Sequence, residues 1–436
     1  MPMYDLGIVN GHLYVDGNWI DGNLYIKGGK IAAISEGFAE AAEEYDCRGK
    51  IVLPGLIDPH VHLSMDAYPY KTVDSFYTGT VAAAFGGITT IIDFLDSAYS
   101  EADIEKLYNE RMELARKCVI DYSFHAAVAA LSGSVREAAV KALDFGMPTV
   151  KIYTTYKEQG WNTPDRITDE LLSISKEYGL RILAHAENDD LIMKSEEIPV
   201  SMHETARPVL AEISEVIKLA EMAEYRNGDL YIVHVSSGST VERLKQKYNK
   251  MLGSSLILES CPHYFTFSSD VYRESEGYLY TMTPPLRCTQ EVEALRKNIS
   301  YINTIATDHC TFKRIYKCQN DINKIPMGVG GIEYSFQIMY NMFGNAVIDK
   351  YTKNVAMAHG LFPKKGVLLP GADADVVIFD PWADCVLYDN HSANDHCIYN
   401  NVRVKGQVVS TVSRGRFVVK DRVFYGGQGA YIERKL

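Results

Sequence analysis

The sequence predicts an α/β protein: a closed (β/α)8 (TIM) barrel with a small β-sandwich formed by the two ends of the chain. The middle of the chain, roughly residues 55–360, alternates apolar strands with amphipathic or alanine-rich helices. Eight strands in βα alternation, as counted here, is the number that closes such a barrel. An open, doubly wound sheet is the alternative, but no G-x-G-x-x-G motif follows the early strands.

Each expected barrel strand is a short apolar segment bounded by turn or helix signals. These strands are residues 51–57, 88–94, 120–129, 149–155, 181–187, 230–237, 254–260 and 302–307. The chain ends differ, because short strands there are separated by hairpin signals at Asn10-Gly11, Asp16-Gly17, Asp21-Gly22 and Gly28-Gly29. We therefore expect residues 55–362 to form the barrel and residues 1–54 and 363–436 to form the two parts of the sandwich.

Composition narrows the class of function. The chain has 436 residues and a net charge of −12, which argues against nucleic acid or an anionic membrane as the main partner. There is no apolar run long enough to span a bilayer and no signal-peptide pattern, so we expect a cytoplasmic protein. The eight cysteines include no C-x-x-C pair and are interpreted as reduced thiols.

The first expected barrel strand ends in GLIDPHVHL, which contains His60 and His62. Residues two apart on a strand point to the same face, and on a barrel strand that face can be the interior. Two converging imidazoles suit a divalent transition metal. Two histidines on an edge strand or a loop remain the alternative interpretation of this pair.

The fourth expected strand carries Lys151 in the otherwise apolar segment VKIYTTY. A buried lysine is costly unless it is paired or modified, and an ammonium cannot bind a metal. Carboxylated by carbon dioxide, the same side chain becomes a carbamate whose two oxygens can bridge two cations. The alternative is a lysine whose stem is buried and whose charged end reaches water.

Three further strand ends carry residues able to bind a metal: His185 in ILAHAEN, His234 in YIVHVSS and Asp308 in TIATDHC. Each alone could be a hydrogen-bonded core residue or a cap. Active sites of this fold lie at the carboxyl ends of the strands, and these six candidates are about what two metal ions need. The remaining histidines are interpreted as structural or surface residues, and Cys310 as a residue that supports Asp308 or packs beside it. A metal-free barrel would require five strand ends to carry such residues by coincidence.

The motifs DPHVH, VKIYTTY, HAEN, IVHVSS and ATDHC, in this order, resemble the cyclic amidohydrolases of the dihydropyrimidinase and D-hydantoinase type. The resemblance covers nearly the whole chain and includes AAAFGGITTIIDF, MTPPLR, GADADVVIFD and HSANDH. It implies binuclear, metal-dependent hydrolysis of a cyclic ureide, a dihydropyrimidine or 5-substituted hydantoin, to an N-carbamoyl amino acid. It also implies two divalent ions, usually zinc, and a homotetramer.

The resemblance assigns roles to the candidate residues. His60, His62 and Asp308 would hold the more buried metal, His185 and His234 the more exposed one, and carboxylated Lys151 would bridge both. Asp308 would also act as general base and then general acid. Tyr156 would hold the scissile carbonyl oxygen, and Thr283, where the family usually has serine, lies in a segment whose main chain grips the ring. These are the catalytic, substrate-binding and metal residues expected from the family.

One position departs from the family pattern. Where the family usually has asparagine, this chain has Met327 in Lys324-Ile325-Pro326-Met327-Gly328. The family contacts substrate there largely through the main-chain carbonyl, so the hydrogen bond can persist while the pocket shape and polarity change. The loops after strands one and four, with Met65, Tyr68, Tyr153 and Trp161, are expected to contact the ring substituent, or simply to pack against one another.

Three other functions remain open. A dihydroorotase would have an arginine at the position of Ser64, and an allantoinase would have an N-E-P-G-like stretch in place of LSMDAY. The third is a non-catalytic scaffold related to dihydropyrimidinases, which would have lost metal ligands. All six candidate ligands are present in this chain, and metal content would separate the scaffold from the enzymes.

Overall fold

Eight parallel strands form the core of the computed structural model, which describes residues 2–67, 69–388 and 391–436. The strands pair in chain order, and a bridge between Val61 and His309 joins the first strand to the segment after the last. The predicted barrel is thereby confirmed. Its strands are β6 (Leu56–Val61), β9 (Ile88–Phe94), β10 (Asp121–Ala127), β11 (Thr149–Tyr153), β12 (Arg181–His185), β13 (Leu230–Ile232), β14 (Leu256–Ser260) and β15 (Thr304–Ile305).

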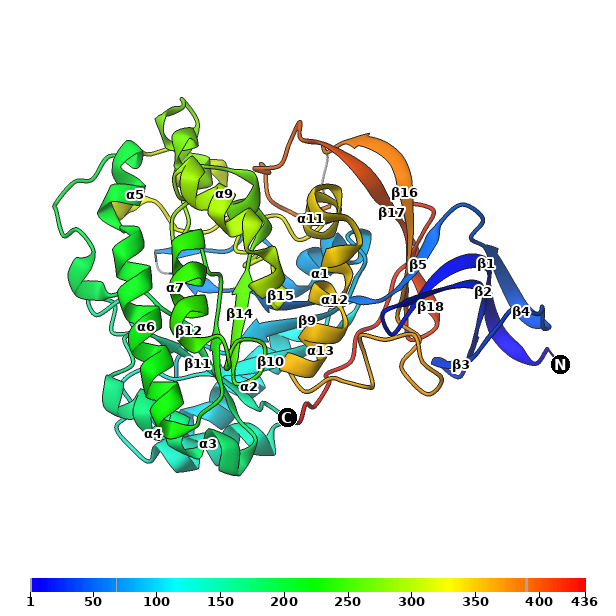
Figure 1. The fold of residues 1–436 in the computed structure, drawn as a ribbon, viewed down its shortest axis with the longest axis horizontal. Helices are drawn as coiled ribbons and strands as arrows, with labels where there is room; N and C mark the ends of the chain where they lie inside the picture. The colour runs from blue at the N-terminus through cyan, green and yellow to red at the C-terminus, as the bar shows by residue number, and fades with distance from the viewer. Residues whose placement is uncertain (1, 68, 389–390) are drawn as a thin grey trace.

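Helices pack around the outside of the barrel (Figure 1). Serine N-caps begin several of them: Ser75, Ser134 and Ser237 each accept a hydrogen bond from the backbone N–H three residues later. The longer helices are α1 (Phe76–Phe85), α2 (Glu101–Ala115), α3 (Val135–Asp144), α4 (Asp165–Tyr178), α6 (Val209–Arg226), α7 (Gly238–Tyr248), α9 (Thr289–Lys297) and α11 (Ser335–Phe343). Shorter ones are α5 (His203–Ala206), α8 (Pro262–Thr266), α10 (Arg314–Lys317), α12 (Ile348–Tyr351) and α13 (Lys353–Ala358).

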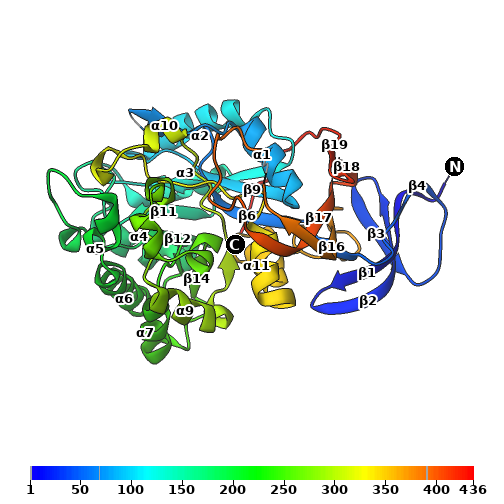
Figure 2. The same cartoon turned by 90° about the horizontal axis from the view of Figure 1, so that it is seen from above.

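Both ends of the chain build one nine-stranded sheet, here called the terminal sheet, beside the barrel (Figures 1 and 2). It has its own apolar core, in which Ile8 and Leu24 from the N-terminal part meet Val376 and Ile378 from the C-terminal part. Its strands are β1 (Tyr4–Val15), β2 (Asn18–Lys27), β3 (Lys30–Ser35), β4 (Ala41–Asp46), β5 (Ile51–Pro54), β16 (Val376–Val386), β17 (Arg403–Ser413), β18 (Arg416–Lys420) and β19 (Val423–Phe424). A separate two-stranded ribbon joins β7 (Asp66–Ala67) to β8 (Tyr70–Lys71).

Two expectations about strand boundaries were wrong. Residues 51–57 are not one barrel strand, because the chain passes from the terminal sheet to the barrel at Gly55, between β5 and β6. A Cβ at Gly55 would lie 2.2 Å from the Thr89 hydroxyl, so only glycine fits this crossing. Asn10-Gly11 is no hairpin turn but a bulge inside β1, and Asp21-Gly22 lies inside β2, where Gly11 pairs with Gly22.

The C-terminal segment returns to the barrel instead of ending in the terminal sheet. Tyr431 forms a bridge with Tyr122 of β10, and the Ile432 amide donates to the Tyr122 carbonyl at 2.8 Å. The chain's C-terminus therefore lies against the barrel, whereas its N-terminus lies at the far end of the terminal sheet (Figure 1). In the part of the chain described, no helix has the length and apolar character needed to cross a membrane.

Candidate active site

A cavity of about 300 Å³ opens at the carboxyl ends of the barrel strands. All the candidate site residues expected from the sequence line it, which brings together segments up to 268 residues apart in the chain from His60 to Gly328. The candidates are His60, His62, Lys151, Tyr156, His185, His234, Thr283, Asp308 and Met327. The barrel explains this convergence, because its parallel strands all end at the same face.

Three of these residues form one tight group. The Nε2 atoms of His60 and His62 lie 3.2 and 3.1 Å from the same carboxylate oxygen of Asp308. His60 is at the end of β6 and His62 follows it, so the strand presents both rings to the cavity. Burial alone would raise the pKa of Asp308, but the imidazoles of His60, His62 and His234 hold it below its usual range. The group therefore combines two imidazoles and a carboxylate, a donor set suited to a divalent ion.

His185 and His234 lie beside this group: their ring centroids are 4.6 Å apart, and the His234 ring is 5.4 Å from that of His60. The Nε2 of His185 donates to Glu187 at 2.8 Å, which leaves its Nδ1 as an acceptor. The Nδ1 of His234 is buried and has no hydrogen-bond partner among the described residues. Burial lowers the pKa of both imidazoles, so both rings are held neutral, the form that binds metals.

Lys151 lies on β11 with 1% of its surface exposed. Its Nζ is 4.9 Å from the centre of the Phe94 ring and 5.2 Å from that of Tyr153. Burial lowers the pKa of Lys151 to about 8, against the opposing effect of Asp308 and Glu259. The amine is thus buried at the cavity and loses its proton more easily than an ordinary lysine does. The neutral amine is the form that reacts with carbon dioxide.

Tyr156 and Thr283 both line the cavity, and their hydroxyl groups are hydrogen-bonded to each other, with the oxygens 2.6 Å apart. Burial raises the pKa of Tyr156 to about 12, so its hydroxyl keeps its proton and can donate a hydrogen bond. The Tyr156 backbone amide donates to Asp189 at 3.0 Å, which fixes the turn that follows β11. This pair can therefore hold an oxygen that becomes negatively charged during a reaction.

Three of the four loop residues expected at the ring substituent line the cavity: Met65, Tyr153 and Trp161. The same three residues continue into an adjoining hollow of about 200 Å³, beside Phe94 and Leu95. Tyr68 lies outside the described residues. The second hollow therefore extends the first: Met65, Tyr153 and Trp161 give it an apolar wall, here called the apolar extension, whereas Asp66, Asp96 and Arg111 line its polar side. The apolar wall suits an apolar group attached to a small polar ring.

Two buried carboxylates orient the histidines and were missed in the sequence. Glu259 of β14 accepts from His60 Nδ1 at 2.8 Å, and Glu187 is held by Arg207 at 2.7 Å while it accepts from His185. Such partners fix the tautomer of a metal-binding imidazole. Glu259 could have been found in the sequence, because like Lys151 it is a charged residue in an otherwise apolar strand. Arg207 has no such sequence signal.

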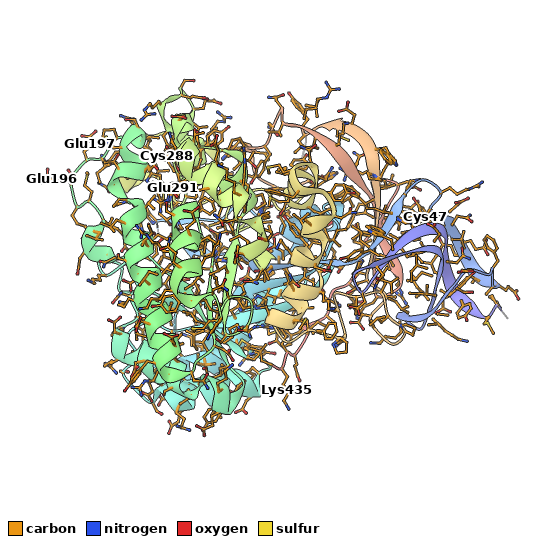
Figure 3. The ribbon with its side chains drawn as sticks, viewed as in Figure 1. Cys47, Glu196, Glu197, Cys288, Glu291 and Lys435 are labelled. Carbon is orange, nitrogen blue, oxygen red and sulfur yellow. The ribbon has the colours of Figure 1, made fainter. Side chains whose placement is uncertain are left out.

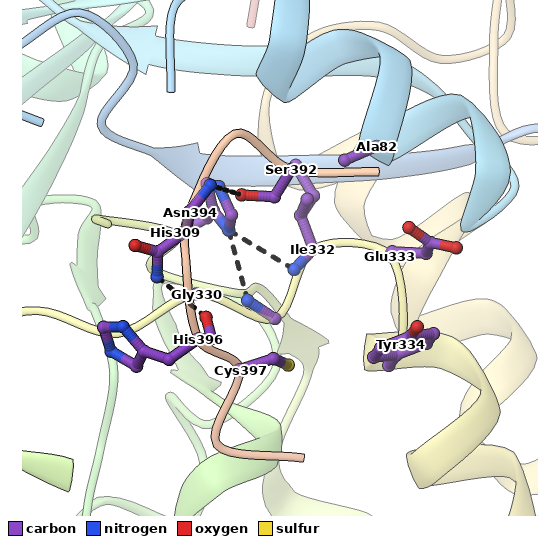
Figure 4. A pocket seen from close by; sticks show the side chains of 11 residues that line it. Ala82, His309, Gly330, Ile332, Glu333, Tyr334, Ser392, Asn394, His396 and Cys397 are labelled. Carbon is purple, nitrogen blue, oxygen red and sulfur yellow. Dashed lines mark hydrogen bonds between the residues drawn. The ribbon is translucent and has the colours of Figure 1, made fainter. Parts of the chain in front are cut away.

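Other polar clusters have structural roles. Asp121, Asp373 and Asp375 form a second group with metal-binding geometry, but the Lys365 ammonium contacts all three at 2.8, 3.2 and 2.5 Å. His309 donates to Asp74 and accepts from the Gly331 and Ile332 amides, so its ring is fixed by hydrogen bonds on both sides. Figure 4 shows His309 beside Ile332 in a separate pocket.

The eight cysteines are free thiols, as expected from the sequence. Cys47 lies in the terminal sheet and Cys288 beside α9, far apart in the molecule (Figure 3). Cys310 lines the cavity, and burial raises the pKa of its thiol well above the usual range. A thiol kept protonated packs as a small apolar group, which agrees with the interpretation of Cys310 as a packing residue.

Comparison with known proteins agrees with this geometry. The amidohydrolase family model matches residues 51–418, and the chain belongs to the amidohydrolase family, whose members use divalent metal ions. Within it, the chain is 33% identical to a D-hydantoinase of Geobacillus stearothermophilus, over 98% of this chain and 96% of that protein. It is 31% identical to a D-phenylhydantoinase of Escherichia coli, over 90% of each.

The fold also matches that of solved structures. A D-hydantoinase structure from Bacillus sp. AR9 superposes with a TM-score of 0.94 at 32% identity, covering 99% of each chain. The resemblance to the dihydropyrimidinase and D-hydantoinase type is thus confirmed, and the protein is a hydrolase that acts on cyclic amides.

Proposed function

We propose that this protein opens the ring of a cyclic ureide, a dihydropyrimidine or a 5-substituted hydantoin, to give an N-carbamoyl amino acid. The observation that carries the proposal is the single cavity in which the metal-competent residues face the hydroxyls of Tyr156 and Thr283. The barrel, residues 55–362, would supply this chemistry, and residues 1–54 and 363–436 would form the supporting second domain.

The donor set fits two divalent ions, proposed to be zinc. His60, His62 and Asp308 would hold one ion, and His185 and His234 would hold the other. The buried Nδ1 of His234, which has no hydrogen-bond partner among the described residues, would then have a ligand role. Lys151, carboxylated, would bridge the two; as an ammonium it would bring positive charge to a ring of metal-binding groups, which is costly when buried. Such a pair of ions lowers the pKa of a shared water and polarises the carbonyl under attack.

The chain's own residues would handle the protons and the ring. Asp308 would accept the proton of the attacking water as general base and then deliver it to the departing ring nitrogen as general acid. Tyr156, whose hydroxyl stays protonated, would donate a hydrogen bond to the carbonyl oxygen as negative charge develops there. The main chain at Thr283 and Met327 would hold the polar edge of the ring.

The ring substituent is proposed to enter the apolar extension formed by Met65, Tyr153 and Trp161. An aromatic group would suit these walls, and the named activity of the D-phenylhydantoinase relative is in keeping with one. Met327, in place of the family asparagine, would make the opposite wall less polar. The enzyme is also proposed to be a homotetramer, which sedimentation equilibrium would test.

Hydrolysis of dihydrouracil, hydantoin and 5-phenylhydantoin, followed in the ultraviolet, tests the proposal. We expect turnover of at least one of the three, with the phenyl compound favoured over hydantoin. Trp161→Ala should reduce that preference, because it removes one wall of the apolar extension. Hydrolysis of dihydroorotate or allantoin in preference to all three ureides would replace the proposal by one of the other cyclic amidases.

A further inference from the structure

A buried lysine outside the metal-binding group lies behind the substrate-binding wall. Lys317 is the last residue of α10, and its side chain is completely buried. Its Nζ donates to the carbonyls of Thr281 at 2.8 Å, Gly328 at 2.6 Å and Pro326 at 3.3 Å. All three donors of the ammonium are therefore used on main-chain carbonyls.

These carbonyls belong to two separate segments of the cavity wall. Thr281 precedes Thr283 by two residues, and Pro326 and Gly328 flank Met327. The Gly328 amide also donates to the Thr281 carbonyl at 3.1 Å, so the two segments are joined directly as well as through Lys317. The lysine thus links the two stretches of main chain that are proposed to grip the substrate ring.

The Met327 carbonyl is not one of the groups that Lys317 holds. Nζ donates to the Pro326 and Gly328 carbonyls on either side of it, and no hydrogen bond joins Nζ to Met327 among the described residues. The Cys310 thiol, which lines the cavity, is the group that approaches the Met327 oxygen, at 4.0 Å. Replacement of the family asparagine by methionine therefore leaves the main-chain acceptor available while the side chain changes.

Burial of the Lys317 ammonium costs free energy that packing alone does not explain. No carboxylate pairs with Lys317 in the described part of the chain, and burial lowers its pKa to about 7. Burying an ammonium without a counter-charge is costly, so an apolar residue would fill this position at lower cost if only packing mattered.

We propose that Lys317 is a positioning residue that holds the Thr281 and Met327 segments at the separation needed to bind the substrate ring. This rests on the proposed function only for the identity of the ring. Lys317 does not touch the reacting atoms; it acts through the main chain of the two segments.

Lys317→Met tests the proposal, with Lys350→Met as the matched control. Lys350 is also a buried lysine that donates to a carbonyl, that of Ile302 at 2.5 Å, but it does not line the cavity. We expect Lys317→Met to raise KM for the ureide about tenfold, the loss of one well-placed main-chain hydrogen bond, with a smaller change in kcat. Lys350→Met should leave KM unchanged. Equal KM values in both variants and the wild type would overturn the proposal.

Hydrogen–deuterium exchange gives a readout that needs no substrate. Peptides covering 279–285 and 325–330 should exchange faster in Lys317→Met and at the wild-type rate in Lys350→Met. Unchanged exchange would overturn the positioning role even if the wild type hydrolysed no ureide, a result that would refute the proposed function separately. If Lys317→Met does not fold, Lys317→Arg keeps the charge but not the length, and the same rise in KM and exchange is expected.

Discussion

At the scale of single residues, three residues of the site have backbone φ angles that are uncommon outside glycine. Tyr156, His234 and Asp308 all have positive φ, at 67°, 41° and 50°. This region is uncommon for residues other than glycine and most unfavourable for a bulky side chain such as tyrosine. Each of the three follows a barrel strand, where a left-handed residue turns the chain sharply. The protein therefore accepts local strain at the cavity in order to aim these side chains into it.

Tyr156→Phe should lower kcat by roughly 10²-fold, because it removes a donor aimed at the developing negative charge. KM should change much less, since the ring's other contacts remain. Steady-state kinetics on the best ureide measure both constants. The control is Tyr264→Phe, which removes a buried hydroxyl from the Pro284 carbonyl and not from the cavity. An unchanged kcat in Tyr156→Phe would rule out this role for the hydroxyl.

Glu259→Gln should weaken metal binding by a factor of roughly 10 to 100, because Glu259 fixes the tautomer of His60. Competition with a chelator measures the affinity directly. Glu212→Gln is the matched control, since Glu212 is a buried carboxylate that accepts from Ser236, Ser237 and Thr240 and, among the described residues, from no histidine. If the two variants lost metal equally, the effect would be one of general destabilisation.

At the scale of elements, the sequence predicted the candidate site better than the strand boundaries. His185, His234 and Asp308 could be found because each ends an apolar segment, and the ends of parallel strands meet at one face. Glu259 carried a similar signal but was not singled out, because its partner His60 is 199 residues away in the chain. No local pattern marks such a pairing, and none marked Arg207 or Lys317.

The errors in the fold have a different cause. Asn-Gly pairs favour hairpin turns, but Gly11 is needed inside β1, where a Cβ would lie 2.8 Å from Val52. Gly55 looked like the interior of a strand because apolar residues continue on both sides of it. In both cases tertiary contacts between distant segments decided the structure, and short-range sequence patterns do not contain them.

Two buried histidines, His125 and His359, should make the folded protein less stable at acidic pH. His359 packs against His125 and Tyr231, and burial holds the pKa of both histidines well below the usual range. The unfolded chain binds these protons near pH 6.5 while the folded chain does not, so stability falls as the pH drops below 6.5. A histidine kept neutral at pH 5 costs about 2 kcal/mol there relative to pH 8.

His359→Phe, which keeps a ring in place, should therefore reduce the loss of stability between pH 8 and pH 5. Denaturant unfolding at the two pH values measures it. His12→Phe is the control, because His12 is partly exposed on the terminal sheet. An identical pH dependence of stability in the wild type and His359→Phe would show that burial of His359 does not cause the loss of stability in acid.

At the scale of the whole molecule, the chain's last residues fasten the barrel. Arg434 is buried and donates to Ser123 at 2.8 Å, Thr149 at 2.9 Å and the carbonyls of Phe124 and His359. The C-terminal segment therefore acts as a strap across three parts of the barrel. It was expected as part of a terminal sandwich and tail, and its docking could not be inferred because a single arginine gives no sequence signal.

Arg434→Met should lower the free energy of unfolding by about 3 kcal/mol, because buried acceptors lose a charged donor. Denaturant unfolding measures the change. Lys435→Met is the matched control, since the neighbouring side chain is exposed and should contribute little. Equal stability of the two variants would show that the strap is not held by Arg434.

The binuclear site is the central claim, and titration of metal into the chelated protein tests it most directly. Ureide turnover is followed as zinc is added to protein stripped by a chelator, with bound metal measured at each step. The account predicts that turnover rises until two ions are bound per chain and then stays constant. Turnover that is complete at one ion, or that persists in the stripped protein, would contradict it.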